Sequence, residues 1–277
     1  MKKTIDLIGQ TVPRIGYGTM RLPGENVMGP PKDYGSAINV LRRVYELGIK
    51  VIDTAWYYGP DVSNKLLAEA LHPYPEDMII ITKLGGKRDE HGGWHRADTP
   101  EELRKGMEHD PRLLKIDAVP IVHLRWMGGD LNDAFRDAFE TMLHMKQEGL
   151  LKHIGLSNVA EEHLDYALQR TGIATVSNAY SFSDRHDDKM VTRCEQEGIA
   201  YLPYFPLAMG KVANHSALLR WAEELRVSPT KLAIAWLLYR SPAILPIPGT
   251  SNIEHLEENV AALNIVLPPE AVTELLA

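Results

Sequence analysis

Cysteine and long apolar runs are both scarce in this sequence. Its 277 residues include a single cysteine, Cys194. This excludes an internal disulfide framework and a metal site built from several cysteines. No segment approaches the roughly 18 uncharged apolar residues of a transmembrane helix. The residues after Met1 also lack the apolar core of a signal peptide. Together these absences predict a cytoplasmic protein with no membrane-spanning helix.

The sequence also lacks any excess of positive charge. The net charge is -7, and basic residues are scattered. We therefore expect neither a nucleic acid nor an acidic membrane surface as partner. No linker rich in proline, glycine or serine divides the chain, so we predict one domain over residues 1–277. No cluster of metal-ligand residues is visible, and the sequence alone leaves the oligomeric state open.

What the chain does contain is a regular alternation of short apolar runs and longer amphipathic segments. The short runs are continuous rather than alternating, as is typical of parallel strands that are covered on both faces. We predict eight such strands, at residues 14–18, 49–54, 78–84, 116–124, 152–158, 173–181, 199–207 and 243–249.

The amphipathic segments have helix start and stop signals. The segment 34–48 ends at Gly48, and Thr99-Pro100 with Glu102 forms a capping-box start. The repeated order predicts an α/β fold, a (β/α)8 TIM barrel, with a doubly wound open sheet as the alternative. Two additions are expected. These are a β-hairpin over 4–12, at the bottom of the barrel, and one extra helix among the two predicted at 213–226 and 229–241.

Polar residues end several of the predicted strands. They are Asp53, Lys83, His123 and the pair Ser157-Asn158, with Tyr58 in the loop after Asp53. Each has a structural explanation on its own: a turn cap for Asp53, a solvent-seeking head for Lys83, and a buried structural role for His123. Because the strands of such a barrel carry the active site at their C-terminal ends, these residues are expected to converge there.

The combination suits proton donation to an oxygen that gains negative charge. The phenol of Tyr58 is a weak acid, and we expect the ammonium of Lys83 to lower its pKa. Asp53 would pair with Lys83, and neutral His123 would orient a substrate carbonyl. No obvious nucleophile is present. The attacking group would therefore be a hydride from a reduced nicotinamide.

These residues also match a known family. The motifs "DTAxxYG" (53–59), "IGLSN" (154–158) and "IPGTSNIEHLEEN" (247–259), with Lys83 and His123, resemble the aldo-keto reductases over essentially the whole chain. The resemblance implies that Tyr58 is the proton donor, that Asp53 and Lys83 tune it, and that His123 orients the carbonyl.

The resemblance also implies a site for NADPH, with NADH as the alternative, although no GxGxxG motif is present. His255 and Gly249 replace cationic residues of many members, which weakens the expected preference for NADPH. Ser177 stands where a glutamine often assists the carboxamide. The resemblance assigns the nicotinamide end to Gly18, Thr19, Met20, Asp53, Ser157, Asn158, Ser177 and Tyr204, the pyrophosphate to Phe205, Pro206, Leu207 and Gly210, and the adenosine end to Ile247, Pro248, Gly249, Thr250, Ser251, Asn252, His255, Glu258 and Asn259.

The substrate is expected to be a small carbonyl compound. The loops 23–31, 85–97 and 125–129 should line its pocket, and we expect contacts from Arg21, Trp56, Trp94, Arg125 and Trp126. Segments such as "VMGPP" (27–31) resemble the subgroup that includes bacterial pyridoxal reductases. A broad-specificity aldehyde or ketone reductase is an equal alternative. Two readings of other classes stay open: an aldolase that forms a Schiff base through Lys83, and a non-catalytic NADP-sensing subunit.

Overall fold

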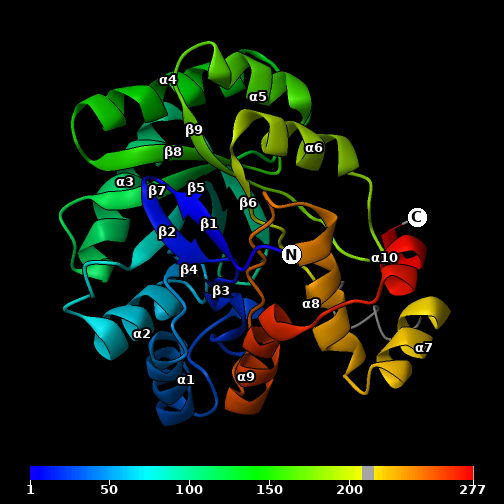
Figure 1. The fold of residues 1–277 in the computed structure, drawn as a ribbon. Coiled ribbons are helices and arrows are strands. Elements are labelled where there is room, and N and C mark those ends of the chain that lie inside the picture. Colours follow the sequence, from blue (N-terminus) through cyan, green and yellow to red (C-terminus); the bar gives the residue numbers. More distant parts are fainter. Residues whose placement is uncertain (208–214, 277) are drawn as a thin grey trace.

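A computed structural model describes residues 1–207 and 215–276. Its main sheet consists of parallel strands with helices around them (Figure 1). Neighbouring strands in this sheet follow the order β10, β9, β8, β7, β5, β4, β3. Their bounds are β3 (Tyr17–Gly18), β4 (Val51–Asp53), β5 (Ile79–Arg88), β7 (Val119–Arg125), β8 (Leu151–Ser157), β9 (Ile173–Ser177) and β10 (Ala200–Tyr201).

The segment 243–248 closes the two edges of this sheet. On one side Leu245 N donates to Tyr201 O of β10 at 2.8 Å. On the other side Gly16 N, just before β3, donates to Pro246 O at 2.8 Å. Pro246 and Pro248 cannot donate, and Ile244 alone forms a bridge, to Tyr201, so the segment has too few ladder bonds to count as a strand. With it the sheet closes into a barrel, which confirms the predicted (β/α)8 fold and makes the open-sheet alternative wrong.

The helices form where the sequence placed their caps. Thr99 accepts from Glu102 N, and the Glu102 carboxylate accepts from Thr99 N, which completes the predicted capping box. The extra helix is α7, which lies with α10 against α8 outside the ring of helices (Figure 1). The helices are α1 (Tyr34–Glu46), α2 (Val62–Leu71), α3 (Pro100–Leu114), α4 (Asp133–Gln147), α5 (Glu161–Leu168), α6 (Asp188–Glu197), α7 (Ser216–Glu224), α8 (Pro229–Arg240), α9 (Ile253–Ala261) and α10 (Pro269–Leu276). None of the described helices is long and apolar enough to cross a membrane.

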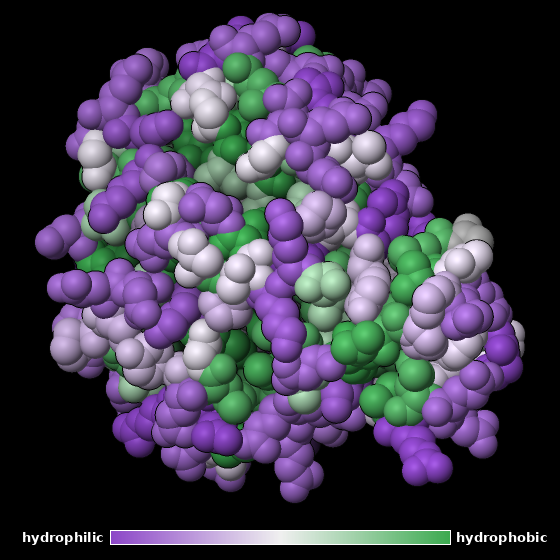
Figure 2. Space-filling view, viewed as in Figure 1, coloured by the Kyte–Doolittle hydropathy of each residue, from purple (hydrophilic) through white to green (hydrophobic). Residues whose placement is uncertain are grey.

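The predicted hairpin is formed by β1 (Thr4–Leu7) and β2 (Gln10–Pro13). It lies in front of the strands in Figure 1. Leu7 and Val12 are each 1% exposed and pack on barrel residues such as Val51 and Ile79. Because those residues begin their strands, the hairpin closes the N-terminal end of the barrel. Figure 2 views this end, which is mostly hydrophilic, with apolar residues gathered around α7, α8 and α10.

One strand was not predicted. β5 runs past the barrel, and β6 (Trp94–Ala97) pairs with this extension in antiparallel register, Gly85 opposite Ala97. Gly85 has a φ of +103°, and a Cβ there would collide with the carbonyl oxygen of Arg125. The two-strand extension therefore stands over the C-terminal end of the barrel, at the opposite end from the hairpin.

Candidate active site

A cavity of about 1510 Å³ opens at the C-terminal ends of the strands. Its floor includes Asp53, Tyr58 and Lys83, which come from the ends of β4 and β5 and the loop between them. The loops predicted to line the pocket contribute to its walls: 23–31 in part, Arg88 to Trp94 in part, and Arg125 with Met127. The structure thus gathers residues that are far apart in sequence around one hollow.

Asp53 and Lys83 form a buried ion pair. Lys83 Nζ lies 2.5 Å from Asp53 Oδ1 and donates a second bond to Thr54 O at 3.0 Å. The two side chains are only 2% and 5% exposed. Burial raises the pKa of Asp53, and the positive charge of Lys83 opposes that shift. Each charge compensates the other, since neither has water to solvate it.

Two adjacent tyrosines reach the cavity, and they differ in accessibility. Tyr57 is fully buried, its hydroxyl is enclosed, and no described residue hydrogen-bonds it. Tyr58 keeps 7% of its surface exposed, and Lys83 Nζ lies 5.1 Å from its ring centroid. Tyr58 is therefore the tyrosine whose hydroxyl a substrate can reach beside the ion pair.

The expected lowering of the Tyr58 pKa by Lys83 is wrong for this structure. Burial raises the pKa of the Tyr58 phenol, and the carboxylate of Asp53 raises it further, while the guanidinium of Arg125 opposes the shift. The main physical reason is the burial of the phenol, and the Asp53 carboxylate that pairs with Lys83 adds to it. The phenol consequently stays protonated at neutral pH.

His123 and Arg125 lie on the same face of β7, one pleat apart. His123 has no exposed surface. Its Nε2 lies 2.6 Å from Thr175 Oγ1, and its Nδ1 is enclosed without a partner among the described residues. Burial, together with the charges of Lys83 and Arg125, lowers its pKa, so the ring is neutral. His123 does not line the cavity, whereas Arg125 does.

The segments predicted for the nicotinamide and pyrophosphate are side by side, but Ser157, Asn158 and Ser177 do not line the cavity. Tyr204 donates to Asn158 Oδ1 at 3.0 Å, and Arg125 Nη1 donates to Ser157 Oγ at 3.3 Å. Ser177 pairs with Ser157 across the strands, and its enclosed hydroxyl has no partner among the described residues. Gly210 lies outside the described residues. The assigned residues that line the cavity are Gly18, Met20, Asp53, Tyr204, Phe205, Pro206, Leu207, Ile247, Pro248, Gly249 and Ser251.

Several other residues assigned to the cofactor do not line the cavity. Thr19 is buried and donates to Thr54 Oγ1 at 2.9 Å. Asn252 caps α9 by accepting from His255 N at 3.0 Å, and Thr250 accepts from Asn252 N at 3.1 Å. His255, Glu258 and Asn259 belong to α9 and do not line the cavity. Thr250 and Asn252 thus shape the start of α9 beside Ser251.

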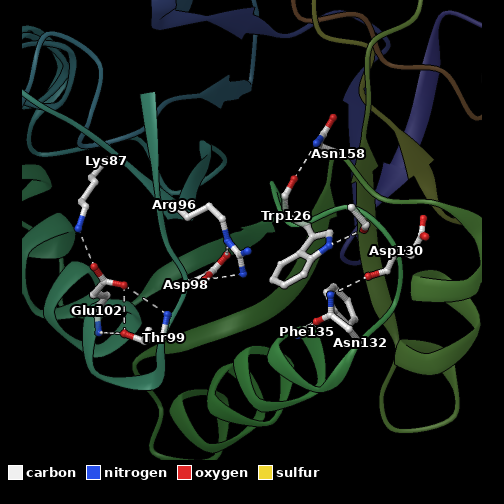
Figure 3. Close-up of polar contacts among 11 residues, drawn as sticks. Lys87, Arg96, Asp98, Thr99, Glu102, Trp126, Asp130, Asn132, Phe135 and Asn158 are labelled. Atoms are coloured by element: carbon white, nitrogen blue, oxygen red, sulfur yellow. Dashed lines mark hydrogen bonds and ion pairs between the residues drawn. The ribbon is translucent and has the colours of Figure 1, made fainter. Parts of the chain in front are cut away.

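The expected substrate contacts divide into two groups. Arg21, Trp94 and Arg125 line the cavity, whereas Trp56 and Trp126 do not. Trp126 is 1% exposed, donates from its indole to Gly129 O at 2.7 Å, and lies under the Arg96 guanidinium at 4.9 Å (Figure 3). Its place next to Arg125 turns it to the outer face of the strand end, so it is a packing residue.

Trp56 makes edge contacts with the rings of Tyr57 and His109. It therefore supports the tyrosine pair from behind. Tyr57 is a cavity residue that the sequence did not assign to the site, whereas Arg88 and Met127 lie in the loops 85–97 and 125–129 that were predicted to line the pocket. A signal for Tyr57 was present, because it neighbours Tyr58 in the same turn.

Comparison with known proteins shows the family to which this fold belongs. Residues 14–277 match the model of the aldo/keto reductase family. The chain belongs to the aldo/keto reductase family. It is 42% identical to pyridoxine 4-dehydrogenase of Escherichia coli over 98% of this chain and 96% of that one. It is 38% identical to an uncharacterized oxidoreductase of Schizosaccharomyces pombe, over 98% and 88%.

Solved aldo/keto reductases share the fold. One from Klebsiella pneumoniae, in complex with NADP and acetate, superposes with a TM-score of 0.81 at 26% identity, over 99% of this chain and 94% of that one. A glycerol dehydrogenase from Gluconobacter oxydans gives a TM-score of 0.85 at 21% identity, over 99% and 95%. The fold of this chain is thus that of the solved aldo/keto reductases.

Proposed function

We propose that this protein reduces the aldehyde group of pyridoxal, or of a closely similar ring-bearing aldehyde, to the alcohol with NADPH. The observation that carries the proposal is the reachable Tyr58 hydroxyl beside the buried Asp53–Lys83 pair, in an aromatic-walled cavity. The 42% identity to pyridoxine 4-dehydrogenase supports the substrate, since that name denotes the same pair of compounds in the reverse direction. The buried, single Cys194 suits a cytoplasmic location.

The residues present fit a nicotinamide cofactor. The unpartnered hydroxyl of Ser177, next to Ser157, offers a donor and acceptor for a carboxamide. Tyr204 presents a partly exposed ring on the cavity wall, and residues 205–207 and 247–251 extend that wall toward the start of α9. When bound, NADPH would supply the hydride that adds to the carbonyl carbon.

The chain itself supplies the proton. Because burial raises the pKa of Tyr58, its hydroxyl carries a proton at neutral pH and can donate it to the carbonyl oxygen. Proton donation leaves a phenolate on Tyr58, whose ring centroid lies 5.1 Å from Lys83 Nζ. The Arg125 guanidinium favours this phenolate and the Asp53 carboxylate opposes it, until solvent returns the proton.

The cavity walls suit a flat ring. Tyr57, Trp94, Tyr204 and Phe205 all line it, and Trp94 lies 4.0 Å under the Arg88 guanidinium. Arg88 also donates to Asn26 O at 2.9 Å. It thereby joins the loop 23–31 to the β5–β6 extension. Aromatic rings stack on such surfaces with a gain of about 1 kcal/mol beyond simple burial.

One further candidate is a broad-specificity aldehyde reductase. Apolar and aromatic residues of the cavity wall, such as Trp94, Met127 and Phe205, would accept many aldehydes without a specific polar contact. The Schiff-base reading fits less well. Such chemistry needs a neutral amine, and the ammonium of Lys83 is held 2.5 Å from a carboxylate.

The test is a substrate panel with the purified protein. Pyridoxal, benzaldehyde and aliphatic aldehydes are supplied with NADPH or with NADH, and the alcohol product is identified by mass spectrometry. We expect NADPH-dependent conversion of pyridoxal to pyridoxine with the highest kcat/KM of the panel. Equal kcat/KM across the panel would support broad specificity instead. Absence of turnover with every aldehyde would contradict the proposed function, and binding of NADPH without turnover would favour the cofactor-sensing subunit.

A further inference from the structure

Arg88 joins two loops that line the cavity, and its described hydrogen bonds all go to backbone carbonyl oxygens. Its Nη2 donates to Gly92 O at 2.7 Å and to Asn26 O at 2.9 Å, and its Nε donates to Gly92 O at 3.2 Å. Gly92 belongs to the turn 89–93 between β5 and β6, whereas Asn26 belongs to the loop 24–29 after β3. One guanidinium therefore holds these two cavity loops together.

The 24–29 loop has a backbone that needs such support. Val27 has a φ of +61°, in the left-handed region that a β-branched residue rarely adopts. A conformation of this kind persists only where surrounding contacts impose it. The Val27 carbonyl oxygen accepts from Arg88 Nη1 at 3.3 Å and from Gly59 N at 3.1 Å, and Gly29 N donates to Gly59 O at 3.0 Å. The loop is thus fixed between Arg88 and the residue that follows Tyr58.

The same guanidinium fixes the ring of Trp94. The guanidinium carbon of Arg88 lies 4.0 Å from the centroid of this ring, and the Tyr57 ring meets it edge-on at 5.8 Å. Trp94 is 42% exposed, and an exposed side chain without such contacts exchanges rotamers freely. A Cβ on Gly92 would lie 3.2 Å from Met28 Cγ, so the two cavity loops are packed against each other. Met28 and Trp94 both line the cavity.

We propose that Arg88 determines the specificity of this enzyme for ring-bearing aldehydes, because it binds the two cavity loops to each other and holds Trp94 as a rigid wall for the substrate ring. This rests on the proposed carbonyl reduction. The substrate ring packs on Trp94 while its aldehyde group lies at Tyr58. A wall that is already in place loses no side-chain freedom when the substrate binds. A short aliphatic aldehyde reaches Tyr58 without this wall, so it gains nothing from Arg88. Arg88 is a positioning residue that acts through Trp94.

The test compares Arg88→Met, Arg88→Lys, Trp94→Leu and a control, Arg96→Met, with the unchanged enzyme. Arg96 belongs to the same β5–β6 extension and pairs with Asp98 at 2.9 Å (Figure 3), but it does not line the cavity. Each protein is measured for kcat and KM with pyridoxal, benzaldehyde and propanal, for the Kd of NADPH by fluorescence titration, and for folding by circular dichroism. Hydrogen–deuterium exchange follows the backbone amides of the two cavity loops.

We expect Arg88→Met to raise the KM for pyridoxal and benzaldehyde about five- to tenfold, the effect of one aromatic contact and one ordered side chain. Its kcat/KM for propanal and its Kd for NADPH should stay within about threefold. Amide exchange in the two cavity loops should accelerate at least about tenfold, because opening no longer breaks the guanidinium bonds. Arg88→Lys should be intermediate, since an ammonium cannot span both loops. Trp94→Leu should lose the ring preference with slow exchange retained, and Arg96→Met should change neither.

Three outcomes would overturn the inference. One is a ratio of kcat/KM for benzaldehyde over propanal that stays within about twofold in Arg88→Met. Another is an equal loss for all three aldehydes, or a loss confined to NADPH binding. The third is unaltered amide exchange in the two cavity loops. If the unchanged enzyme reduces the aldehydes and Arg88→Met keeps the ratio, this inference fails and the proposed function stands. If the unchanged enzyme reduces none of them, the proposed function fails, and amide exchange alone decides whether Arg88 holds the loops.

Discussion

Breaking the buried Asp53–Lys83 ion pair should lower the free energy of unfolding far more than breaking a surface ion pair. The two charged atoms are 2.5 Å apart, and the side chains are 2% and 5% exposed. Removing one partner leaves a buried charge uncompensated, at a cost of about 3–5 kcal/mol. Lys105 and Glu101 on α3 form an exposed pair at 2.8 Å, 71% and 78% exposed, which is worth about 0–1 kcal/mol.

The assay is a double-mutant cycle in urea, followed by far-ultraviolet circular dichroism. Asp53→Asn and Lys83→Met should each lower the free energy of unfolding by about 3–5 kcal/mol, or the melting temperature by roughly 6–15 °C. The double variant should regain about half or more of the unfolding free energy that each single variant loses, because no buried charge remains unpaired. Lys105→Met is the matched control and should change stability by less than about 1 kcal/mol.

Two results would refute this reasoning. One is a loss below about 1 kcal/mol in either single variant, which would mean that the pair is solvated or exchanges with other partners. The other is a double variant whose loss equals the sum of the two single losses, which would mean that the charges do not interact.

Two further predictions concern stability away from the catalytic residues. Asp110 on α3 is buried, accepts from Asn64 and Thr82, and burial raises its pKa to about 7. Asp110 therefore loses its proton at a lower pH in the unfolded chain than in the folded protein. As the pH rises from about 4 to 7, the free energy of unfolding consequently falls, by on the order of 4 kcal/mol at most. Asp110→Asn should therefore stabilise the protein more at about pH 8 than at about pH 5 in urea titrations; an equal effect at both would contradict the raised pKa. Leu7→Ala, in the hairpin that closes the barrel, should cost about 2–5 kcal/mol, and a cost below about 1 kcal/mol would show that the hairpin is dispensable.

Much of the fold was predictable because local signals and tertiary packing agree in it. Thr99, Pro100 and Glu102 start a helix by local hydrogen bonds, and the structure has that helix. The hairpin turn at Gly9 likewise follows from short-range preference, with a φ of +80°. The β5–β6 extension was missed because Gly85 and Gly86 are typical of a loop, although the two strands pair as a local hairpin from Gly85 to Ala97.

The site was predictable to the level of strand ends, and no further. Asp53, Tyr58 and Lys83 are gathered as the strand order requires. The period of two on a strand places His123 and Arg125 on one face, so the sequence alone does not show which of them reaches the cavity. Trp126 illustrates the same limit, since the residue next to an inward one points outward. The adenosine-end residues on α9 were ambiguous because Asn252 serves both as a helix cap and as a donor near a phosphate.

The central claim is that the Tyr58 hydroxyl donates the proton to the carbonyl oxygen. The most direct measurement is steady-state NADPH oxidation with pyridoxal by Tyr58→Phe and Tyr57→Phe, side by side. Both variants remove one hydroxyl from the same turn and keep the ring. The account predicts that kcat falls by about 10²–10⁴-fold in Tyr58→Phe and by less than about tenfold in Tyr57→Phe. A Tyr58→Phe enzyme that retains its kcat, or a larger loss in Tyr57→Phe, would contradict it.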